Sequence, residues 1–484
     1  MAESDRLPLQ DWMTAPETRA VVAAVTAGGA PARFVGGCVR DALAGRPVRD
    51  IDLATPEPPE RVMELLRAAG LKAVPTGLDH GTVTAVSGHR PFEITTLRHD
   101  VETFGRRAKV AFTDDWEADA ARRDFTFNAL SCTPEGELHD YFGGRADLLA
   151  GRVRFVGEAR RRIAEDYLRL LRFFRFHAFF GRGAPDPDGL AAAAAAAPKL
   201  AELSPERVRA ELFRLLQATD PVPVLDVMLG HAILAAELPE AASTQTLSNW
   251  LALEAHPSDA QAPDPLPRFA ALLDPAADAL EIAKRLRLSN AERDRLAGLL
   301  RPTPRLDPGM TPKALRAALY RLGRQQVEDG LRLAAARAGR DGGLDQALSQ
   351  ALPQALRAVA AWHPSAFPVK GRDLRALGMA PGAEMGRLLA ELEAWWIAED
   401  FRPDRAALLA RIFRLTGPCG LFVSSTVCTG DMSAKVRWIA AAVRVLPVLP
   451  DIASLTEAGL VAEIEAAGFT VEERWRPSPD KALF

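Results

Sequence analysis

The sequence predicts an α+β protein in which a small α/β head precedes a long all-helical part and a short α/β extension. Residues 33 to about 145 alternate short β-rich runs with turn signals, which is typical of a sheet. After Gly151 the apolar residues recur with the period of an α-helix over most of the chain. Because 484 residues are too many for one hydrophobic core, we expect three or more domains.

The head contains five runs with the composition of strands, and we expect them to form one five-stranded sheet. Helical stretches lie between them, near residues 39–44 and 60–69. The segment from 98 to 116 is polar and basic with one glycine, which predicts a mobile loop. The expected strands are 33–35, 50–54, 82–86, 92–97 and 127–133.

In the helical part, proline-rich breaks separate blocks of helices. Near residue 417 the sequence again becomes rich in residues that favour β-strands. We therefore predict five parts. They are a head at 1–150, a neck at 151–215, a body at 216–330, a tail at 331–416 and an extension at 417–484.

The bulk composition favours a soluble protein of the cytoplasm. The net charge is −3, so RNA contacts must come from local basic clusters, although such a cluster is more often a solvated face. The four cysteines lie far apart and lack zinc-binding spacing. The N-terminus lacks the apolar core of a signal peptide, and no late apolar stretch is long enough to span a bilayer. We predict no membrane contact and no protein partner.

Two aspartates in the head are the first candidates for chemistry. The run Arg33-Phe-Val-Gly-Gly-Cys-Val-Arg-Asp41 is followed by Asp50-Ile-Asp52. Side chains alternate along a strand, so Asp50 and Asp52 share one face while their apolar neighbours point into the core. Two adjacent carboxylates repel each other unless a cation lies between them. The pair therefore predicts a metal-binding site, although an isolated Asp-X-Asp is common on solvated strand edges.

A double glycine precedes these aspartates. Gly36 and Gly37 let the backbone approach a phosphate closely, and the following helix offers N–H groups to an anion. By itself a Gly-Gly pair is usually only a turn. Next to a carboxylate pair, it provides the arrangement that nucleotidyl transfer requires. In this order and spacing the segment resembles motif A of the polymerase-beta-type nucleotidyltransferases, in the class of bacterial CCA-adding enzymes and poly(A) polymerases.

Two later segments of the head also resemble that family. The strand Phe92-Glu-Ile-Thr-Thr-Leu-Arg98 is similar to a family strand and makes Glu93 a candidate third carboxylate; a charged residue on an exposed strand face is the alternative. The run Ala121-Arg-Arg-Asp-Phe-Thr-Phe-Asn-Ala129 is similar to the family's Arg-Arg-Asp motif. We assign Arg123 to phosphate or sugar contact and Asp124 to holding the head together.

The segment from Ile163 to Phe176 predicts one helix on which Asp166 and Arg169 share a face. Asp166 only accepts hydrogen bonds and Arg169 only donates them. Cytosine and adenine each present an exocyclic amine beside a bare ring nitrogen, which suits this pair. Uracil and guanine present the reverse and would leave buried groups unpaired. On spacing alone, a plain surface salt bridge between the two residues is the alternative.

The pattern Glu-Asp-x-x-Arg-x-x-Arg-x-x-Arg-Phe in this segment resembles the nucleotide-selection helix of class II tRNA nucleotidyltransferases. The resemblance implies a polymerase-beta-like head, tRNA, CTP and ATP as substrates, and Mg²⁺ held by the two aspartates of motif A. The implied catalytic residues are Asp50, Asp52 and Glu93. The implied nucleotide contacts are Gly36, Gly37, Arg40, Arg123, Asp166, Arg169, Arg172 and Arg175, the last two for the triphosphate.

Other functions remain open at this point. A poly(A) polymerase would share the head and neck but add only A, and a non-catalytic RNA-binding module would share the fold. The segment from Pro368 to Gly378 resembles the family's tail element, which is expected to hold the tRNA elbow. The extension resembles the end of a class I methyltransferase. It lacks a preceding Gly-x-Gly loop, so we expect no methyltransferase activity.

Overall fold

The computed structural model describes residues 6–78, 81–104, 107–254, 263–339, 346–376, 379 and 381–416, with four isolated positions at 458, 461, 462 and 465. The chain divides into two compact units. The first comprises Met1–Pro308 and Asp329–Leu352, and the second comprises Gly309–Glu328 and Pro353–Phe484. Apart from those four positions, the predicted methyltransferase-like extension lies outside the described residues.

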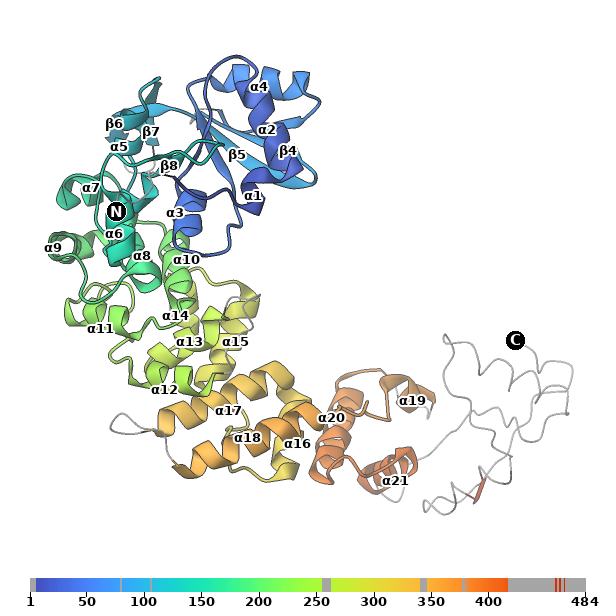
Figure 1. The fold of residues 1–484 in the computed structure, drawn as a ribbon. Coiled ribbons are helices and arrows are strands. Elements are labelled where there is room, and N and C mark those ends of the chain that lie inside the picture. The colour runs from blue at the N-terminus through green and yellow to red at the C-terminus, as the bar shows by residue number, and fades with distance from the viewer. Residues whose placement is uncertain are drawn as a thin grey trace, which may run out of the picture. The chain divides into compact units, whose positions relative to one another are not determined.

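The head is built on a mixed sheet with the strand order β3-β4-β5-β2-β1-β8-β9 (Figure 1). The β2–β5 pair is parallel, and the other pairs in this sheet are antiparallel. Its strands are β1 (Arg33–Val35), β2 (Asp52–Thr55), β3 (Lys72–Gly77), β4 (Thr82–Ser87), β5 (Arg90–Thr96), β8 (Ser131–Cys132) and β9 (Leu138–His139).

The two faces of this sheet differ in character. Phe34, Leu53 and Ile94 are cross-strand neighbours on one face, and all three are buried. They belong to the same apolar cluster as residues of α2 (Pro16–Thr26) and α4 (Pro59–Ala68), which follow the short α1 (Asp11–Thr14). Asp52 and Glu93 are neighbours on the opposite face, away from this cluster. Strand alternation therefore separates the core from the face that carries the predicted carboxylates.

All five predicted strand regions contain strand, but β3 and β9 were not predicted. The edge strand β3 contains a proline and is half exposed, so its sequence lacks the usual alternation. The last predicted strand is shorter than expected, because Thr126–Asn128 forms the 3₁₀ turn η2. That turn buries Phe127 among other aromatic rings, which a strand pattern does not distinguish from sheet pairing.

The prediction of a loop at 98–116 is wrong. Strands β6 (Arg98–Phe104) and β7 (Arg107–Phe112) form a separate antiparallel ribbon, and α5 (Trp116–Ala121) follows. Its two strands pair with each other, and charged residues are frequent in both, so no continuous apolar run marks them. Its composition therefore resembles that of a polar loop.

The predicted helix at 163–176 is two helices. Helix α7 (Ala159–Glu165) ends before Asp166, whose backbone is extended, and α8 (Leu168–Phe180) follows. The Asp166 carboxylate accepts a hydrogen bond from the Leu168 backbone N–H (3.1 Å), so it competes with the helical hydrogen bonds at this point. The neighbouring helices are α3 (Gly37–Leu43), α6 (Gly144–Ala150), α9 (Pro187–Ala196), η3 (Ala197–Glu202) and α10 (Pro205–Leu216).

Aromatic rings join α8 to the head. The rings of Phe125 and Phe155 lie 4.7 Å apart, and Phe155 stacks on Phe173 of α8 at 5.6 Å. Phe125 also meets the edge of Phe176 at 5.2 Å. All four rings are buried, so this packing fixes α8 against the Arg-Arg-Asp segment of the head.

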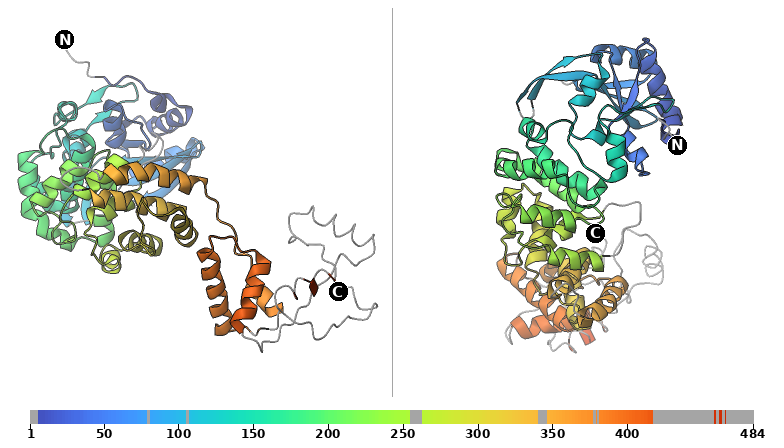
Figure 2. Two further views of the ribbon diagram at one scale, coloured as in Figure 1. Left: turned by 90° about the horizontal axis from the view of Figure 1, so that it is seen from below. Right: turned by 60° about the vertical axis from the view of Figure 1, so that its left-hand side comes forward.

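The rest of the first unit is helical, as predicted, and the right-hand view of Figure 2 shows its green helices in successive layers below the head. Arg268 is 2% exposed and connects three segments here. Its Nη1 donates to the carbonyls of Leu216 and Ala218 (2.6 Å each), and its Nε donates to Glu254. These helices are α11 (Val222–Gly230), α12 (Gln245–Leu253), α13 (Pro265–Leu272), α14 (Ala279–Arg285) and α15 (Asn290–Leu300).

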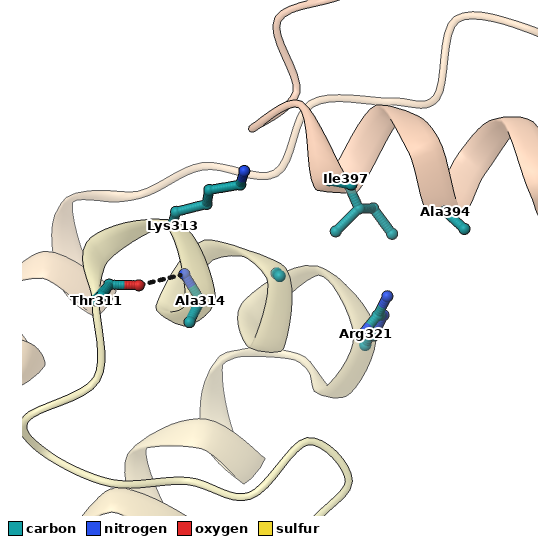
Figure 3. A pocket seen from close by; sticks show the side chains of 8 residues that line it. Thr311, Lys313, Ala314, Arg321, Ala394 and Ile397 are labelled. Carbon is teal, nitrogen blue, oxygen red and sulfur yellow. Dashed lines mark hydrogen bonds between the residues drawn. The ribbon is translucent and has the colours of Figure 1, made fainter.

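The second unit has its own core around Trp396, whose ring meets those of Tyr320 (5.6 Å) and Phe401 (4.9 Å). A cavity of about 290 Å³ lies between α16 and α20. Figure 3 shows Lys313 and Arg321 on α16 and Ile397 projecting from α20. The helices are α16 (Pro312–Leu322), α19 (Gly371–Ala376), α20 (Ala383–Ala398) and α21 (Arg405–Thr416), while α17 (Arg324–Ala338) and α18 (Gln346–Ala361) extend into both units.

The predicted boundary between body and tail, at residue 330, lies inside α17. Within the described residues, no helix is both long enough and apolar enough to span a membrane.

Candidate active site

A cavity of about 480 Å³ lies where the face of the head sheet that carries Asp52 meets α8 and α10. Eight of the eleven predicted site residues line it, although they come from segments up to 136 residues apart. The predicted residues that the wall includes are Gly36, Gly37, Arg40, Asp52, Arg123, Asp166, Arg169 and Arg172. The other lining residues are Arg122, Asp124, Asn128, Leu168, Phe176 and Arg207.

Three carboxylates gather at the sheet end of this cavity. Asp52 begins β2 and pairs with Glu93 of β5, and Asp50 lies two residues before the strand. Burial, followed by the charge of Glu93, raises the pKa of Asp52 to about 6, and Asp50 contributes to the shift. Asp50 and Glu93 are exposed and lie beside Asp52 rather than on the cavity wall.

These carboxylates fit a hard divalent cation. A cation next to Asp52 would relieve the repulsion that raises its pKa. Among the described residues, no group of three or more His, Cys, Asp or Glu side chains is arranged to hold a metal by itself. Mg²⁺ does not require such a cage, because it usually binds one or two carboxylates and completes its shell with water and substrate phosphates.

The double glycine forms a tight turn between β1 and α3. Gly36 has φ 68° and ψ −119°, a backbone conformation that side chains other than glycine rarely tolerate. A Cβ atom at Gly36 would lie 2.8 Å from Nη1 of Arg123. Because glycine has no Cβ atom, the guanidinium of Arg123 can lie next to it in the cavity wall, and the backbone of the turn stays accessible from the cavity.

Arg40 and Arg123 are held in position by protein groups. Arg40 is 12% exposed; its Nη1 donates to Oδ1 of Asn128 (2.7 Å), and its Nε donates to Asp41 (2.9 Å). Arg123 donates to Oδ2 of Asp119 (3.3 Å). Burial alone would raise the pKa of Asp119, but its two neighbouring arginines lower it overall. Both guanidinium groups are thus orientated before any ligand binds.

Asp124 joins the head to α8, whereas the sequence predicted only that it holds the head together. It is buried, and its Oδ2 accepts hydrogen bonds from Nε (2.7 Å) and Nη2 of Arg172. Its Oδ1 accepts from Asn128 (2.9 Å). Burial would raise the pKa of Asp124, yet the charge of Arg172 and the bond from Asn128 hold the pKa below its ordinary value.

Arg175 is the one predicted triphosphate contact that the structure does not bring to the cavity wall. Its Nε donates to Glu211 of α10 (2.6 Å), and its guanidinium lies over the ring of Phe176 at 4.2 Å. Only 14% of its side chain is exposed. The family resemblance implied the triphosphate role of Arg175, and neither it nor helical spacing reveals that α10 covers this side of α8.

Asp166 and Arg169 line the cavity together, but each is paired with another residue. Oδ2 of Asp166 accepts from Nη2 of Arg207 (2.7 Å), and Nη1 of Arg169 donates to Glu165 (2.5 Å). Their side chains are 22% and 15% exposed. This arrangement differs from the surface salt bridge that spacing alone allowed. It orientates an acceptor and a donor side by side in one wall.

Arg207 and Glu211 are two charged residues that sequence reasoning missed and that pair with predicted site residues. Both lie on α10, about 40 positions beyond the segment they support. Glu211 is 4% exposed and adjoins the buried Leu212 and Leu215. A charged residue beside the apolar stripe of a helix is the one local feature that could have indicated a buried partner.

Two family models match the chain. Residues 32–154 match the family described as Poly A polymerase head domain. Residues 184–244 match the family described as probable RNA and SrmB-binding site of polymerase A.

Full-length relatives agree with these matches. The CCA tRNA nucleotidyltransferase 1, mitochondrial, of Danio rerio is 34% identical over 410 residues, which cover 78% of this chain and 86% of the relative. The CCA-adding enzyme of Geobacillus stearothermophilus is 42% identical over 190 residues, covering 39% and 46%. The crystal structure of the Bacillus stearothermophilus CCA-adding enzyme in complex with CTP superposes with a TM-score of 0.61 at 26% identity, covering 79% of this chain and 93% of that one.

Proposed function

The chain belongs to the family of CCA tRNA nucleotidyltransferases, and we propose that it adds C, C and A to the 3′ end of tRNA from CTP and ATP without a nucleic-acid template. One observation carries this proposal. The candidate base-reading pair, Asp166 and Arg169, lies in the wall of the same cavity as Asp52 and the candidate phosphate-binding arginines.

Base selection is assigned to Asp166 and Arg169. Both oxygens of Asp166 already accept one hydrogen bond, from Leu168 and Arg207, and a carboxylate has further lone pairs for an exocyclic amine. Arg169 donates to Glu165 and to the carbonyls of Arg162 and Arg122, and of its five N–H donors it keeps two for a bare ring nitrogen. Cytosine and adenine satisfy both groups. Uracil and guanine leave buried groups unpaired, at about 1–3 kcal/mol for each group.

The triphosphate is assigned to the turn at Gly36 and Gly37 and to Arg40, Arg123 and Arg172. These guanidinium groups are fixed by Asn128, Asp119 and Asp124, so little side-chain entropy is lost when they bind phosphate oxygens. Their role is to hold the α-phosphorus in line for attack by the 3′-hydroxyl of tRNA. The attack forms the new phosphodiester and releases pyrophosphate.

Asp50 and Asp52, with Glu93 beside them, are the residues that would hold Mg²⁺. When bound, Mg²⁺ supplies positive charge that favours the deprotonated 3′-hydroxyl and neutralises the departing pyrophosphate. We assign the second unit, with the tail-like segment that begins at Pro368, to contact with tRNA. We also retain the predicted division into head, neck, body and tail, and the cytoplasm as its location.

Primer extension tests the proposal. The purified protein is incubated with Mg²⁺ and tRNA transcripts that end before CCA, after C and after CC, with each nucleotide separately and with CTP and ATP together. We expect C, C and then A, with extension ending there. Because the head matches a family named for poly(A) polymerase, long A tails would assign that activity instead. No extension of any acceptor would leave an RNA-binding module.

A further inference from the structure

Arg33 lies on the same face of the sheet as Asp52. It pairs with Ala54 across β1 and β2, and Ala54 is two residues beyond Asp52 on β2. Cross-strand partners and alternate residues of one strand share a face. Arg33 is therefore displaced from the candidate catalytic carboxylate by roughly 7 Å along the strand direction and one strand across. That separation is within the reach of a single nucleotide.

Aromatic groups hold the Arg33 side chain in a fixed position. Its guanidinium lies over the ring of Trp116 at 4.1 Å from the centroid, and its Nη1 donates to the hydroxyl of Tyr141 (3.2 Å). Trp116 in turn packs against the buried Val35 and Ala54 of the sheet. The stack therefore rests on the strands that carry Asp52, and it orientates the guanidinium at little further entropic cost.

This guanidinium differs from those of the nucleotide cavity. Arg40, Arg123 and Arg172 are each paired with a carboxylate. Across the part of the chain that the structure describes, Arg33 has an aromatic ring and a phenol as its partners instead of an acidic group. It is half-buried beside Tyr141, which is 37% exposed. Its uncompensated charge and its remaining N–H donors suit an anion that arrives from solvent.

We propose that Arg33, held by Trp116 and Tyr141, binds the phosphodiester that joins the last two nucleotides of the RNA acceptor strand. This inference rests on the proposed function, because it places the 3′-hydroxyl of the acceptor at Asp52. The bond to Arg33 fixes the position of the preceding phosphate, and so the direction from which the hydroxyl approaches. The partner is the RNA backbone, so the contact is independent of base identity.

Binding and single-nucleotide addition test the proposal with Arg33→Gln in the full chain. The acceptors are a tRNA transcript that ends in CC and the same transcript without its single-stranded 3′ end. For the first we expect the Kd and the KM to rise about tenfold, with the KM for ATP unchanged. The slope of log Kd against log salt should decrease by about 0.7, the value for one phosphate of a single strand. For the shortened transcript the Kd should not change.

Arg90→Gln is the matched control. Arg90 is also half-buried and lies near a ring, that of Phe92 at 6.0 Å, but it sits on the opposite face of the sheet. Arg90→Gln removes the same charge from the head and should leave the Kd for both transcripts unchanged; because Arg90 donates to the carbonyl of Arg49, beside Asp50, the control is read in binding alone. Tyr141→Phe removes only the hydroxyl and should give a smaller rise in Kd, about threefold, so it decides the matter if Arg33→Gln fails to fold.

Two results would overturn the role of Arg33. One is a Kd for the CC-ending transcript that equals that of Arg90→Gln, and the other is an equal loss of affinity for the shortened transcript. The proposed function fails in a different way, when the wild-type protein binds tRNA but adds no nucleotide. The binding comparison between the two transcripts still decides the role of Arg33 in that case.

Discussion

The charged side chains that line the cavity have fixed hydrogen-bond or ion-pair partners before substrate binds. Among these side chains, Asp52 carries the charge that its neighbours compensate least. Its pKa is raised from 3.8 to about 6, first by burial and then by Glu93. Because the folded-state pKa lies above the unfolded-state value, the charged carboxylate destabilises the fold. This penalty is absent below about pH 4 and complete above about pH 6.

We therefore expect Asp52→Asn to stabilise the protein when divalent cations are absent. The free energy of unfolding should increase by about 1–3 kcal/mol at about pH 7.5 and should not change at about pH 4. Urea unfolding at the two pH values measures this. A variant that is destabilised at the higher pH would show that the charge of Asp52 is compensated in the folded protein.

The same position tests the catalytic assignment. Asp52→Ala should abolish nucleotide addition while the Kd for tRNA stays within about twofold of wild type, since an exposed RNA-binding surface does not depend on this half-buried carboxylate. Filter binding and primer extension on one preparation measure both quantities. Wild-type turnover in this variant would refute the metal-binding role of Asp52.

Arg207 orientates Asp166, so it should affect nucleotide choice without touching the triphosphate. Arg207→Met removes the 2.7 Å hydrogen bond to Asp166 and should lower the preference for CTP over UTP about tenfold. The ratio of kcat/KM for the two nucleotides measures this. Arg209→Met is the control, because Arg209 lies on the same helix and pairs with Glu292 instead. An unchanged ratio in Arg207→Met would exclude this positioning role.

At the scale of elements, the ion pair between Asp124 and Arg172 joins the head to α8. The pKa of Asp124 is held below its ordinary value of 3.8 by Arg172, in spite of burial. A lowered folded-state pKa means that the pair stabilises the protein above about pH 4, and that this stability is lost as the pH falls through the folded-state pKa.

Asp124→Asn should therefore lower the free energy of unfolding by about 3 kcal/mol at about pH 7, because it leaves Arg172 without its principal partner. The difference between the free energies of unfolding of variant and wild type should become smaller at about pH 3. Asp294→Asn is the control, since Asp294 is 68% exposed in its pair with Arg293 and should change stability by less than about 0.5 kcal/mol. Equal stability of the Asp124 variant and this control would show that the ion pair between Asp124 and Arg172 does not stabilise the protein.

Local sequence patterns predicted an element correctly where a single effect, such as the alternation of buried and exposed side chains, determines its residues. Asp52 alternates with buried residues, so its strand and its exposed face followed from side-chain periodicity, although the strand begins at Asp52 and leaves Asp50 outside it. The break at Asp166 did not, because apolar residues keep helical spacing on both sides of it and only the hydrogen bond to Leu168 marks the end of α7. The ribbon β6–β7 also escaped prediction, since charged residues interrupt the apolar pattern of its strands.

At the scale of the whole molecule, the site is assembled from segments that local pattern cannot connect. Arg207 lies 41 residues beyond Asp166, and Glu93 lies 41 residues beyond Asp52. Eight of the predicted residues line one cavity, and the family resemblance could group them because it carries long-range information that periodicity lacks. It also placed Arg175 at the triphosphate, whereas α10 pairs this side chain with Glu211.

In the proposed reaction, protein side chains select the base. The most direct test of this selection is kcat/KM for CTP, ATP, UTP and GTP on transcripts ending before CCA and after CC, for wild type and for Asp166→Ala and Arg169→Ala, with the Kd for tRNA measured in parallel. We predict that wild type uses CTP on the first transcript and ATP on the second, and that both variants lose this preference while their Kd for tRNA is unchanged. Retained preference for CTP and ATP in both variants would contradict the account.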